Sequence, residues 1–238
     1  MAELLALENV TAGYRDTVVL ESISVAIGSQ ESWAVLGRNG VGKTTLLMTV
    51  MGLTAMRGGV IRFAGQDLAA LGTHRRARAG IGYVSQEREI FPSLTVEENL
   101  RVAAAPGEWD RERVYDLFPR LAERRRNYGN QLSGGEQQML AVGRALVGNP
   151  KLLLLDEPFE GLAPVIIEAL AEALTRLKRE SAIATALVEQ QVDIALELTE
   201  NVLVLDKGQI VWSGTSAALA GDRERLASLV GLQEANVS

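Results

Sequence analysis

The sequence predicts an α/β protein with a mostly parallel sheet flanked by helices, an antiparallel β subdomain and an inserted α-helical subdomain. An apolar run at 33–36 leads through a glycine-rich loop into a helix-like stretch at 45–51. The purely apolar run 152–155 ends at an acidic residue, as is typical of a buried parallel strand. Between these runs, residues 106–131 are charged and favour helix, which predicts the inserted subdomain.

The other elements follow from local patterns. Residues 4–10 and 18–27 are apolar and β-branched, and we expect an antiparallel pair with Gly13 and Tyr14 in the turn between them. A Thr95-x-x-Glu98 capping box predicts a helix start. Further strands are expected at 58–63, 81–85, 182–188, 201–206 and 209–213, and helices at 139–147, 165–179, 191–199 and from 215 onward.

We expect one domain over residues 1–238. Its α/β core, with the antiparallel β subdomain, spans approximately 1–86 and 150–238. The helical subdomain spans approximately 87–149.

The segment 37–44 matches the P-loop pattern G-x-x-x-x-G-K-[ST] in the required strand–loop–helix context. Its residues are Gly37, Arg38, Asn39, Gly40, Val41, Gly42, Lys43 and Thr44, and Thr45 opens the helix that follows. Glycines allow consecutive N–H groups to face one concavity, and the helix dipole favours an anion there. We expect these residues to bind nucleotide phosphates, with Lys43 on the outer phosphates and Thr44 on Mg²⁺. The core is therefore predicted to be that of a P-loop NTPase, although a plain glycine-rich turn stays an alternative.

Residues 132–138 read Leu-Ser-Gly-Gly-Glu-Gln-Gln and precede an apolar helix. Ser133 and Glu136 form a capping box, so a plain helix cap is one interpretation. Gly134 and Gly135 are poor helix formers, and their presence makes sense if a ligand approaches the backbone closely. The exposed N–H groups of such a helix start would form a second phosphate site.

Two acidic residues, Asp156 and Glu157, follow the apolar run 152–155. Ligands in open α/β sheets bind at the carboxyl ends of the strands. We therefore expect Asp156 to hold Mg²⁺, directly or through water, and Glu157 to orient and deprotonate an attacking water. Two acids at a strand end also occur by chance, so this prediction depends on the motifs around it.

The composition limits the remaining classes of function. The net charge is −6, which argues against non-specific binding of nucleic acid. There is no cysteine and only one histidine, which exclude disulfides, thiolate sites and histidine metal sites. The first residues lack the pattern of a signal peptide, so none is expected. Apolar runs are far shorter than the roughly 20 residues of a spanning helix, so a membrane role would require a partner.

With the P-loop, the acidic pair and LSGGEQQ at 132–138, the chain resembles the ATP-binding cassette (ABC) ATPases over its whole length. The resemblance implies a head-to-tail dimer in which each ATP lies between the P-loop of one subunit and the signature segment of the other. Gln86 matches the glutamine that contacts Mg²⁺ and senses the membrane partner. Tyr14 matches the aromatic residue that stacks on adenine, a contact worth only about 0.5–1.5 kcal/mol, so a structural role for Tyr14 stays open.

Within the family, the chain is most similar to the second ATPase subunit of branched-chain amino-acid importers. The segments that carry this likeness are 89–100, 117–121, 161–164 and 187–190. Segments 36–42 and 160–161 fit the subunit of urea and short-amide importers at least as well.

The resemblance implies uptake of branched-chain or related hydrophobic amino acids, powered by ATP hydrolysis with Mg²⁺ as the metal cofactor. Its partners would be two membrane permease subunits, a second ATPase subunit of the same or a related kind, and indirectly a periplasmic or extracellular solute-binding protein. No nucleic acid is expected. The location would be cytoplasmic, at the inner face of the plasma (inner) membrane.

Two positions depart from the broader family, and both departures occur in the branched-chain subgroup. Ala163 replaces the aspartate of the dimer-contact loop, and Gln190 replaces the switch histidine. Gln190 can donate a hydrogen bond to the γ-phosphate but cannot carry charge. Capping of the following helix is the alternative role for Gln190.

Two other classes of protein remain as rivals. A soluble ABC ATPase that acts on DNA or ribosomes would need a coiled-coil insertion between Gln86 and Leu132, or a second cassette, and the sequence offers neither. A nucleotide-gated interaction module without turnover would not need the intact Glu157. The sequence therefore favours an ATPase that serves a transporter.

Overall fold

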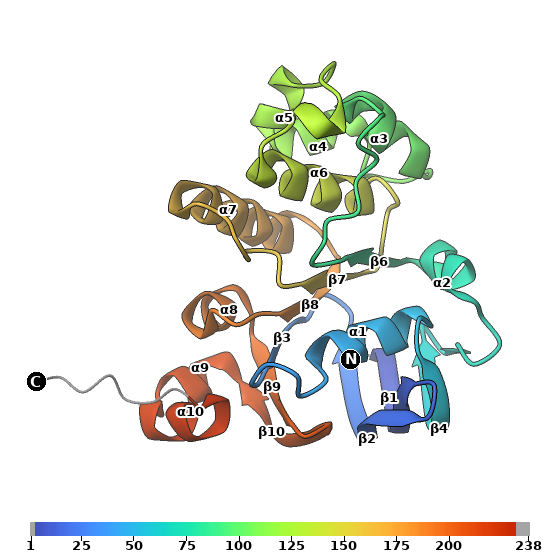
Figure 1. Ribbon diagram of the computed structural model, residues 1–238, viewed down its shortest axis with the longest axis vertical. Helices are drawn as coiled ribbons and strands as arrows, with labels where there is room; N and C mark the ends of the chain where they lie inside the picture. Colours follow the sequence, from blue (N-terminus) through green and yellow to red (C-terminus); the bar gives the residue numbers. More distant parts are fainter. Residues whose placement is uncertain (1–2, 232–238) are drawn as a thin grey trace, which may run out of the picture.

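The computed structural model describes residues 3–231, so both ends of the predicted 1–238 domain, including the last residues of its polar tail, lie outside the described residues. Over this range the strands form a six-stranded sheet, β10-β9-β3-β8-β7-β6, and a four-stranded sheet, β2-β1-β4-β5 (Figure 1). The strands are β1 Glu3–Tyr14, β2 Thr17–Gly28, β3 Ser32–Leu36, β4 Ala55–Phe63, β5 Gln66–Asp67, β6 Ile81–Val84, β7 Leu152–Asp156, β8 Ala184–Val188, β9 Asn201–Asp206 and β10 Gln209–Thr215. The helices are α1 Lys43–Met51, α2 Thr73–Ala79, α3 Val96–Ala103, α4 Arg111–Leu117, α5 Pro119–Glu123, η1 Gly129–Gln131, α6 Gly134–Leu146, α7 Pro164–Glu180, α8 Val192–Leu198, α9 Ser216–Ala220 and α10 Arg223–Val230.

The larger sheet is parallel except at its β10 edge, and this confirms the predicted fold class. Its centre is buried on both faces. On β7, Leu153 and Leu155 belong to one hydrophobic core, while Leu152 and Leu154 belong to the other. Successive side chains of a strand point to opposite faces, so a strand covered on both sides needs an unbroken apolar run. That requirement explains the four consecutive leucines of the sequence.

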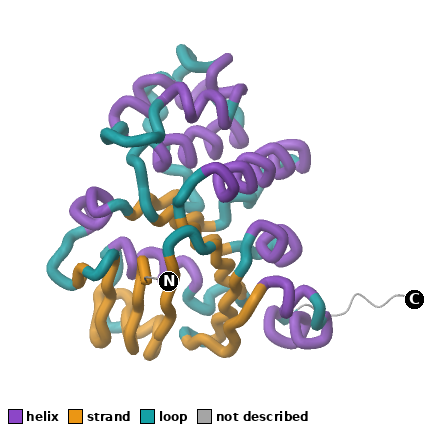
Figure 2. The backbone as a smooth tube through the Cα atoms, turned by 180° about the vertical axis from the view of Figure 1, so that it is seen from behind, coloured by secondary structure: helices purple, strands orange, loops and turns teal. Residues whose placement is uncertain are grey.

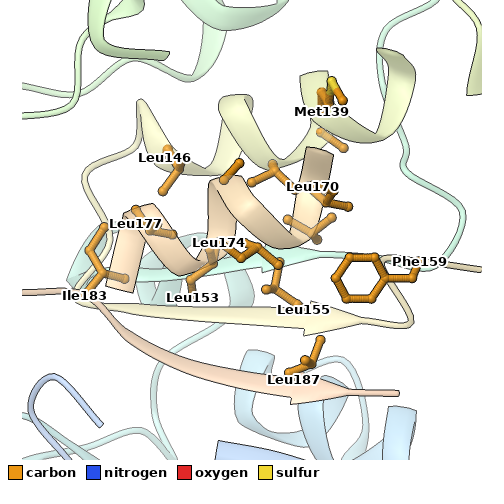
Figure 3. Close-up of a cluster of buried hydrophobic side chains, with 14 of the residues drawn as sticks. Met139, Leu146, Leu153, Leu155, Phe159, Leu170, Leu174, Leu177, Ile183 and Leu187 are labelled. Atoms are coloured by element: carbon orange, nitrogen blue, oxygen red, sulfur yellow. The ribbon is translucent and has the colours of Figure 1, made fainter. Parts of the chain in front are cut away.

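One face of this sheet is covered by α6 and α7. Figure 3 shows Leu170 and Leu174 of α7 above Leu155 of β7, while Leu146 of α6 lies above the part of the cluster that holds Leu153. Phe159, just beyond β7, is fully buried in the same cluster and fixes the loop that follows the strand. Helices α3 to α6 gather at one end of the molecule, and the antiparallel sheet lies at the other (Figures 1 and 2).

The antiparallel pairing of β1 with β2 is confirmed, but the predicted turn was placed wrongly. β1 continues through Gly13 to Tyr14, and Arg15 and Asp16 make the turn. A Cβ at Gly13 would lie 2.0 Å from the carbonyl oxygen of Thr17 on β2. Glycine is therefore required because the two strands approach closely, and not because the chain reverses there.

Other bounds differ from the sequence predictions. α1 begins at Lys43 and not at Thr45, and β4 begins at Ala55 and not at Gly58. β6 ends at Val84, and neither β5 nor α2 was predicted. Strand and helix ends are set by pairing and by caps, which apolar periodicity does not record. No helix within residues 3–231 combines the length and apolar character needed to cross a membrane.

Candidate active site

The loop between β3 and α1 carries three glycines in backbone conformations that favour glycine. The φ angles of Gly37, Gly40 and Gly42 are 142°, 80° and 111°. At Gly37, a Cβ would lie 2.3 Å from the carbonyl oxygen of Leu205 on β9. The loop is therefore held tightly against the sheet, and its conformation is available mainly to glycine.

The ammonium group of Lys43 lies at the centre of this loop. Lys43 is 5% exposed, and its Nζ donates hydrogen bonds to the carbonyl oxygens of Gly37 at 2.9 Å and Arg38 at 3.1 Å. Burial lowers the pKa of Lys43, and the negative charges of Glu157 and Asp156 act in the opposite direction. The site thus places one buried cation beside two carboxylates.

Asp156, the last residue of β7, is held at both carboxylate oxygens. Its Oδ1 accepts a hydrogen bond from the Thr44 hydroxyl at 2.9 Å, and its Oδ2 accepts one from the Tyr83 hydroxyl at 3.1 Å. Burial raises the pKa of Asp156, and these two hydrogen bonds oppose the shift. No local pattern in the sequence indicates this role of Tyr83. Its place on β6, the strand paired with β7, is the only signal that could have found it.

Glu157 follows β7 directly and lies in the left-handed backbone region, with φ of 47°. Its N–H donates to the carbonyl oxygen of Val188 at 2.9 Å, and its side chain is largely buried. The Nε2 of Gln190 donates a hydrogen bond of 2.6 Å to the Glu157 carboxylate. Gln191, not Gln190, is the N-cap residue of α8, and α8 has no side-chain cap. The side chain of Gln190 is thus directed to Glu157 and does not cap the helix.

Several of these residues line one cavity of about 350 Å³, whereas Asp156 and Tyr83 lie behind its wall, where Asp156 bonds to both Thr44 and Tyr83. It is lined by Val19, Asn39, Gly40, Gly42, Lys43, Thr44, Thr45, Gln86, Glu157, Glu160 and Gln190. The structure therefore brings together the P-loop, Gln86 and the Glu157–Gln190 pair. Val19 and Glu160 were not anticipated, and Glu160 accepts a hydrogen bond from the Gln86 amide.

Tyr14 is not among the residues that line this cavity. Its side chain is 42% exposed. Its hydroxyl donates to the Met48 sulfur at 3.1 Å and lies 3.5 Å from the Thr45 hydroxyl. Tyr14 therefore contacts the helix that begins at the P-loop and leaves much of its ring accessible.

The segment 133–136 also lies outside the cavity lining, at the start of α6 among the helices in the upper part of Figure 1. Ser133 and Glu136 cap this helix reciprocally, with bonds of 3.3 Å and 2.8 Å. A Cβ at Gly135 would lie 2.5 Å from a side-chain carbon of Ile166 on α7. Close packing of α6 on α7 thus gives one structural reason for the second glycine.

No group of three or more His, Cys, Asp or Glu side chains suited to a metal occurs within residues 3–231. A divalent cation at this site would therefore be held by a few protein oxygens together with oxygens of the substrate phosphates. The hydroxyl oxygen of Thr44, the carboxylate of Asp156 and the amide oxygen of Gln86 could supply these ligands, because hard cations prefer oxygen.

Comparisons with known proteins agree with this geometry. A family model described as "ABC transporter" matches residues 20–160. The chain is 42% identical over 221 residues to BraG, a high-affinity branched-chain amino-acid transport ATP-binding protein of Pseudomonas aeruginosa, covering 91% of this chain and 94% of BraG. It is 34% identical over 229 residues to the lipopolysaccharide export ATP-binding protein LptB of Haemophilus influenzae, covering 93% and 94% of the two chains.

The fold also matches solved structures. A dimeric ATP-binding cassette in a post-hydrolysis state, bound to ADP and Pi, superposes with a TM-score of 0.79 at 24% identity, covering 89% of this chain and 98% of that one. That structural likeness supports the fold, whereas the family model and the similar proteins identify the family. The chain belongs to the ABC transporter family and is an ATPase domain of that family.

Proposed function

We propose that this chain is the ATP-hydrolysing subunit of an importer of branched-chain or related hydrophobic amino acids. Its higher identity to BraG than to LptB is the observation that carries the proposal. The segments 89–100, 161–164 and 187–190 favour the same subgroup. A urea or short-amide importer is the alternative, supported by segment 36–42.

In this proposal the P-loop amides and Lys43 bind the phosphates of ATP. The Lys43 ammonium exchanges its bonds to the Gly37 and Arg38 carbonyl oxygens for phosphate oxygens, which carry full negative charge and make stronger hydrogen bonds. The exposed ring of Tyr14 is available to stack on the adenine. The base would then lie beside α1 and the phosphates at its N-terminus.

The residues that would hold Mg²⁺ are Thr44, Asp156 and Gln86. Their fit is supported by the 2.9 Å hydrogen bond between the Thr44 hydroxyl and Asp156, because these two oxygens already converge. Tyr83 holds the second carboxylate oxygen of Asp156 and fixes its orientation. When bound, Mg²⁺ supplies charge neutralisation at the outer phosphates.

For hydrolysis, Glu157 accepts a proton from the attacking water. A glutamine amide has two N–H groups, and one of those on Gln190 is directed to the Glu157 carboxylate. The second is available for an oxygen of the γ-phosphate. Gln190 would therefore set the position of the base relative to the phosphate, without adding a charge of its own.

The signature residues Ser133, Gly134, Gly135 and Glu136 are proposed to complete the site of a second ATPase subunit. This is supported by their separation from the cavity that holds the P-loop and by the exposed position of Gly134, the first residue of α6. ATP binding then closes a homodimer, or a heterodimer with a related subunit, and hydrolysis reopens it. The dimer would drive two membrane permeases at the inner face of the membrane, supplied by a solute-binding protein.

The test is transport in reconstituted vesicles. The chain would be assembled with candidate permeases and a candidate binding protein, sought among the neighbouring genes, and uptake of labelled leucine and urea would be measured with ATP. We expect ATP-dependent leucine uptake that is lost with Glu157→Gln. Uptake of urea without leucine would overturn the substrate and leave the ATPase role intact.

A further inference from the structure

Glu189 is a buried acidic residue that the proposed site does not use. It follows β8 directly and is 3% exposed. No ion pair involves it within residues 3–231. Burial raises the pKa of Glu189, and hydrogen bonds from the N–H groups of Gln191, Phe159 and Gln190 oppose the shift. A buried carboxylate that forms no ion pair is costly unless hydrogen bonds replace its hydration.

Three backbone donors replace that hydration, and they come from two different loops. Oε1 of Glu189 accepts from the N–H of Phe159 at 3.1 Å, in the loop after β7. Oε2 accepts from the N–H groups of Gln190 at 2.9 Å and Gln191 at 3.2 Å, in the loop after β8. One side chain therefore joins the loop of Glu157 to the loop of Gln190.

The two ends of this bridge differ in how firmly the rest of the protein holds them. Phe159 is fully buried in the core under α7, so its N–H is a fixed point (Figure 3). Gln190 lies outside any strand or helix, and its own backbone N–H bonds only to Glu189. The bond from the Glu157 N–H to the Val188 carbonyl joins the same loops closer to the sheet. Glu189 thus ties the loop after β8 to the buried loop after β7.

We infer that Glu189 is a positioning residue for ATP hydrolysis, which holds the backbone of Gln190 so that its amide meets the carboxylate of Glu157. The inference rests on the proposed roles of Glu157 and Gln190. A carboxylate suits this task because both of its oxygens accept hydrogen bonds. A glutamine at this position has one accepting oxygen, and its NH₂ group faces a backbone N–H. An aspartate keeps both oxygens but reaches less far.

The test compares kcat and KM for ATP in Glu189→Gln, Glu189→Asp, Gln190→Ala and the double variant Glu189→Gln/Gln190→Ala. Glu197→Gln makes the same chemical change at an exposed position of α8 and is the matched control. We expect Glu189→Gln to lower kcat by about 10- to 100-fold with KM within about twofold of wild type, because misplacement by about an ångström has effects of this size. Glu189→Asp should be intermediate, and Glu197→Gln should match wild type. If the glutamine variant does not fold, the aspartate variant takes its place in the comparison.

The double variant separates positioning from an independent effect. If Glu189 acts through Gln190, the double variant is no slower than Gln190→Ala, because the group that Glu189 positions is already absent. A wild-type kcat in the folded Glu189 variants, or a double variant with the product of the two single effects, would overturn the inference. Full activity in Gln190→Ala would overturn the proposed role of Gln190 as well. Slow Gln190→Ala with normal Glu189 variants would overturn the Glu189 inference alone.

Discussion

The Nε2 atom of Gln190 donates a hydrogen bond of 2.6 Å to the carboxylate of Glu157. The two residues belong to the loops after β8 and β7, which are neighbouring parallel strands paired through Val188 and Asp156. Two residues far apart in the sequence therefore meet at the same edge of the sheet. The bond joins the proposed base to the proposed γ-phosphate contact, so changes at either residue should affect the same step.

Gln190→Ala should slow hydrolysis while leaving ATP affinity nearly unchanged. The loss of one hydrogen bond to a charged group is worth about 1.5–3 kcal/mol, which corresponds to a fall in kcat of about 10- to 100-fold. Steady-state phosphate release over a range of ATP concentrations measures both quantities. Full activity in this variant would place Gln190 away from the γ-phosphate.

Gln190→His should introduce a new ionisation into the pH–rate profile. Glutamine does not titrate, whereas histidine has an unperturbed pKa of about 6.5. We expect the profile of kcat to change between about pH 6 and 7.5, where imidazole gains or loses its proton. The profiles of wild type and variant would be measured at matched protein concentration, since dimer formation also depends on concentration. Superimposable profiles would count against contact of residue 190 with the reacting groups.

Lys43→Ala should abolish nucleotide binding or turnover. The ammonium of Lys43 offsets phosphate charge that the amides of the loop do not neutralise. Displacement of a fluorescent nucleotide reports binding, and phosphate release reports turnover. Lys151→Ala, at an exposed lysine before β7, is the control and should behave as wild type. Wild-type ATPase activity of Lys43→Ala would refute the P-loop assignment.

Arg76→Met should lower the stability of the fold. The guanidinium of Arg76 is buried, and it donates to the carbonyl oxygens of Thr49 and Val50 at the end of α1 and of Leu68, at 3.0, 2.9 and 2.9 Å. Methionine would leave these buried acceptors unsatisfied, and we expect the free energy of unfolding to fall by about 3 kcal/mol. Urea unfolding followed by circular dichroism measures the change. Arg75→Met, at the exposed neighbour, should have almost no effect; equal midpoints for the two variants would contradict this role of Arg76.

The sequence predicted the features whose causes are local. The apolar run of β7, the capping box at Ser133 and the glycine-rich loop before α1 each depend on a few consecutive residues, and each lies where expected. The capping box at Thr95 likewise opens α3. Local patterns of this kind record backbone requirements directly, so one sequence is enough to find them.

The features that the sequence did not reveal depend on contacts between distant segments. Arg76 is one of several arginines in α2, and nothing local separates its buried side chain from its exposed neighbours. Tyr83 and Glu189 act on residues of other strands or loops. Gly13 was predicted to lie in a turn because glycine is required both where a chain reverses and where two strands approach closely, and the structure shows the second cause. The roles of these residues depend on strand register and on packing between distant segments, which local patterns in one sequence do not reveal.

The Glu157→Gln variant tests the proposed general base and the proposed dimer in one experiment. The amide has the shape of the carboxylate but cannot accept a proton from water, and general-base catalysis contributes about 10²- to 10⁴-fold. The measurement combines phosphate release with light scattering in the presence of ATP and Mg²⁺, with Glu197→Gln as control. We predict a variant that binds ATP, loses most of its hydrolysis and accumulates as an ATP-bound dimer. A variant that stays monomeric with ATP and hydrolyses it at the wild-type rate would contradict both the role of Glu157 and the dimer.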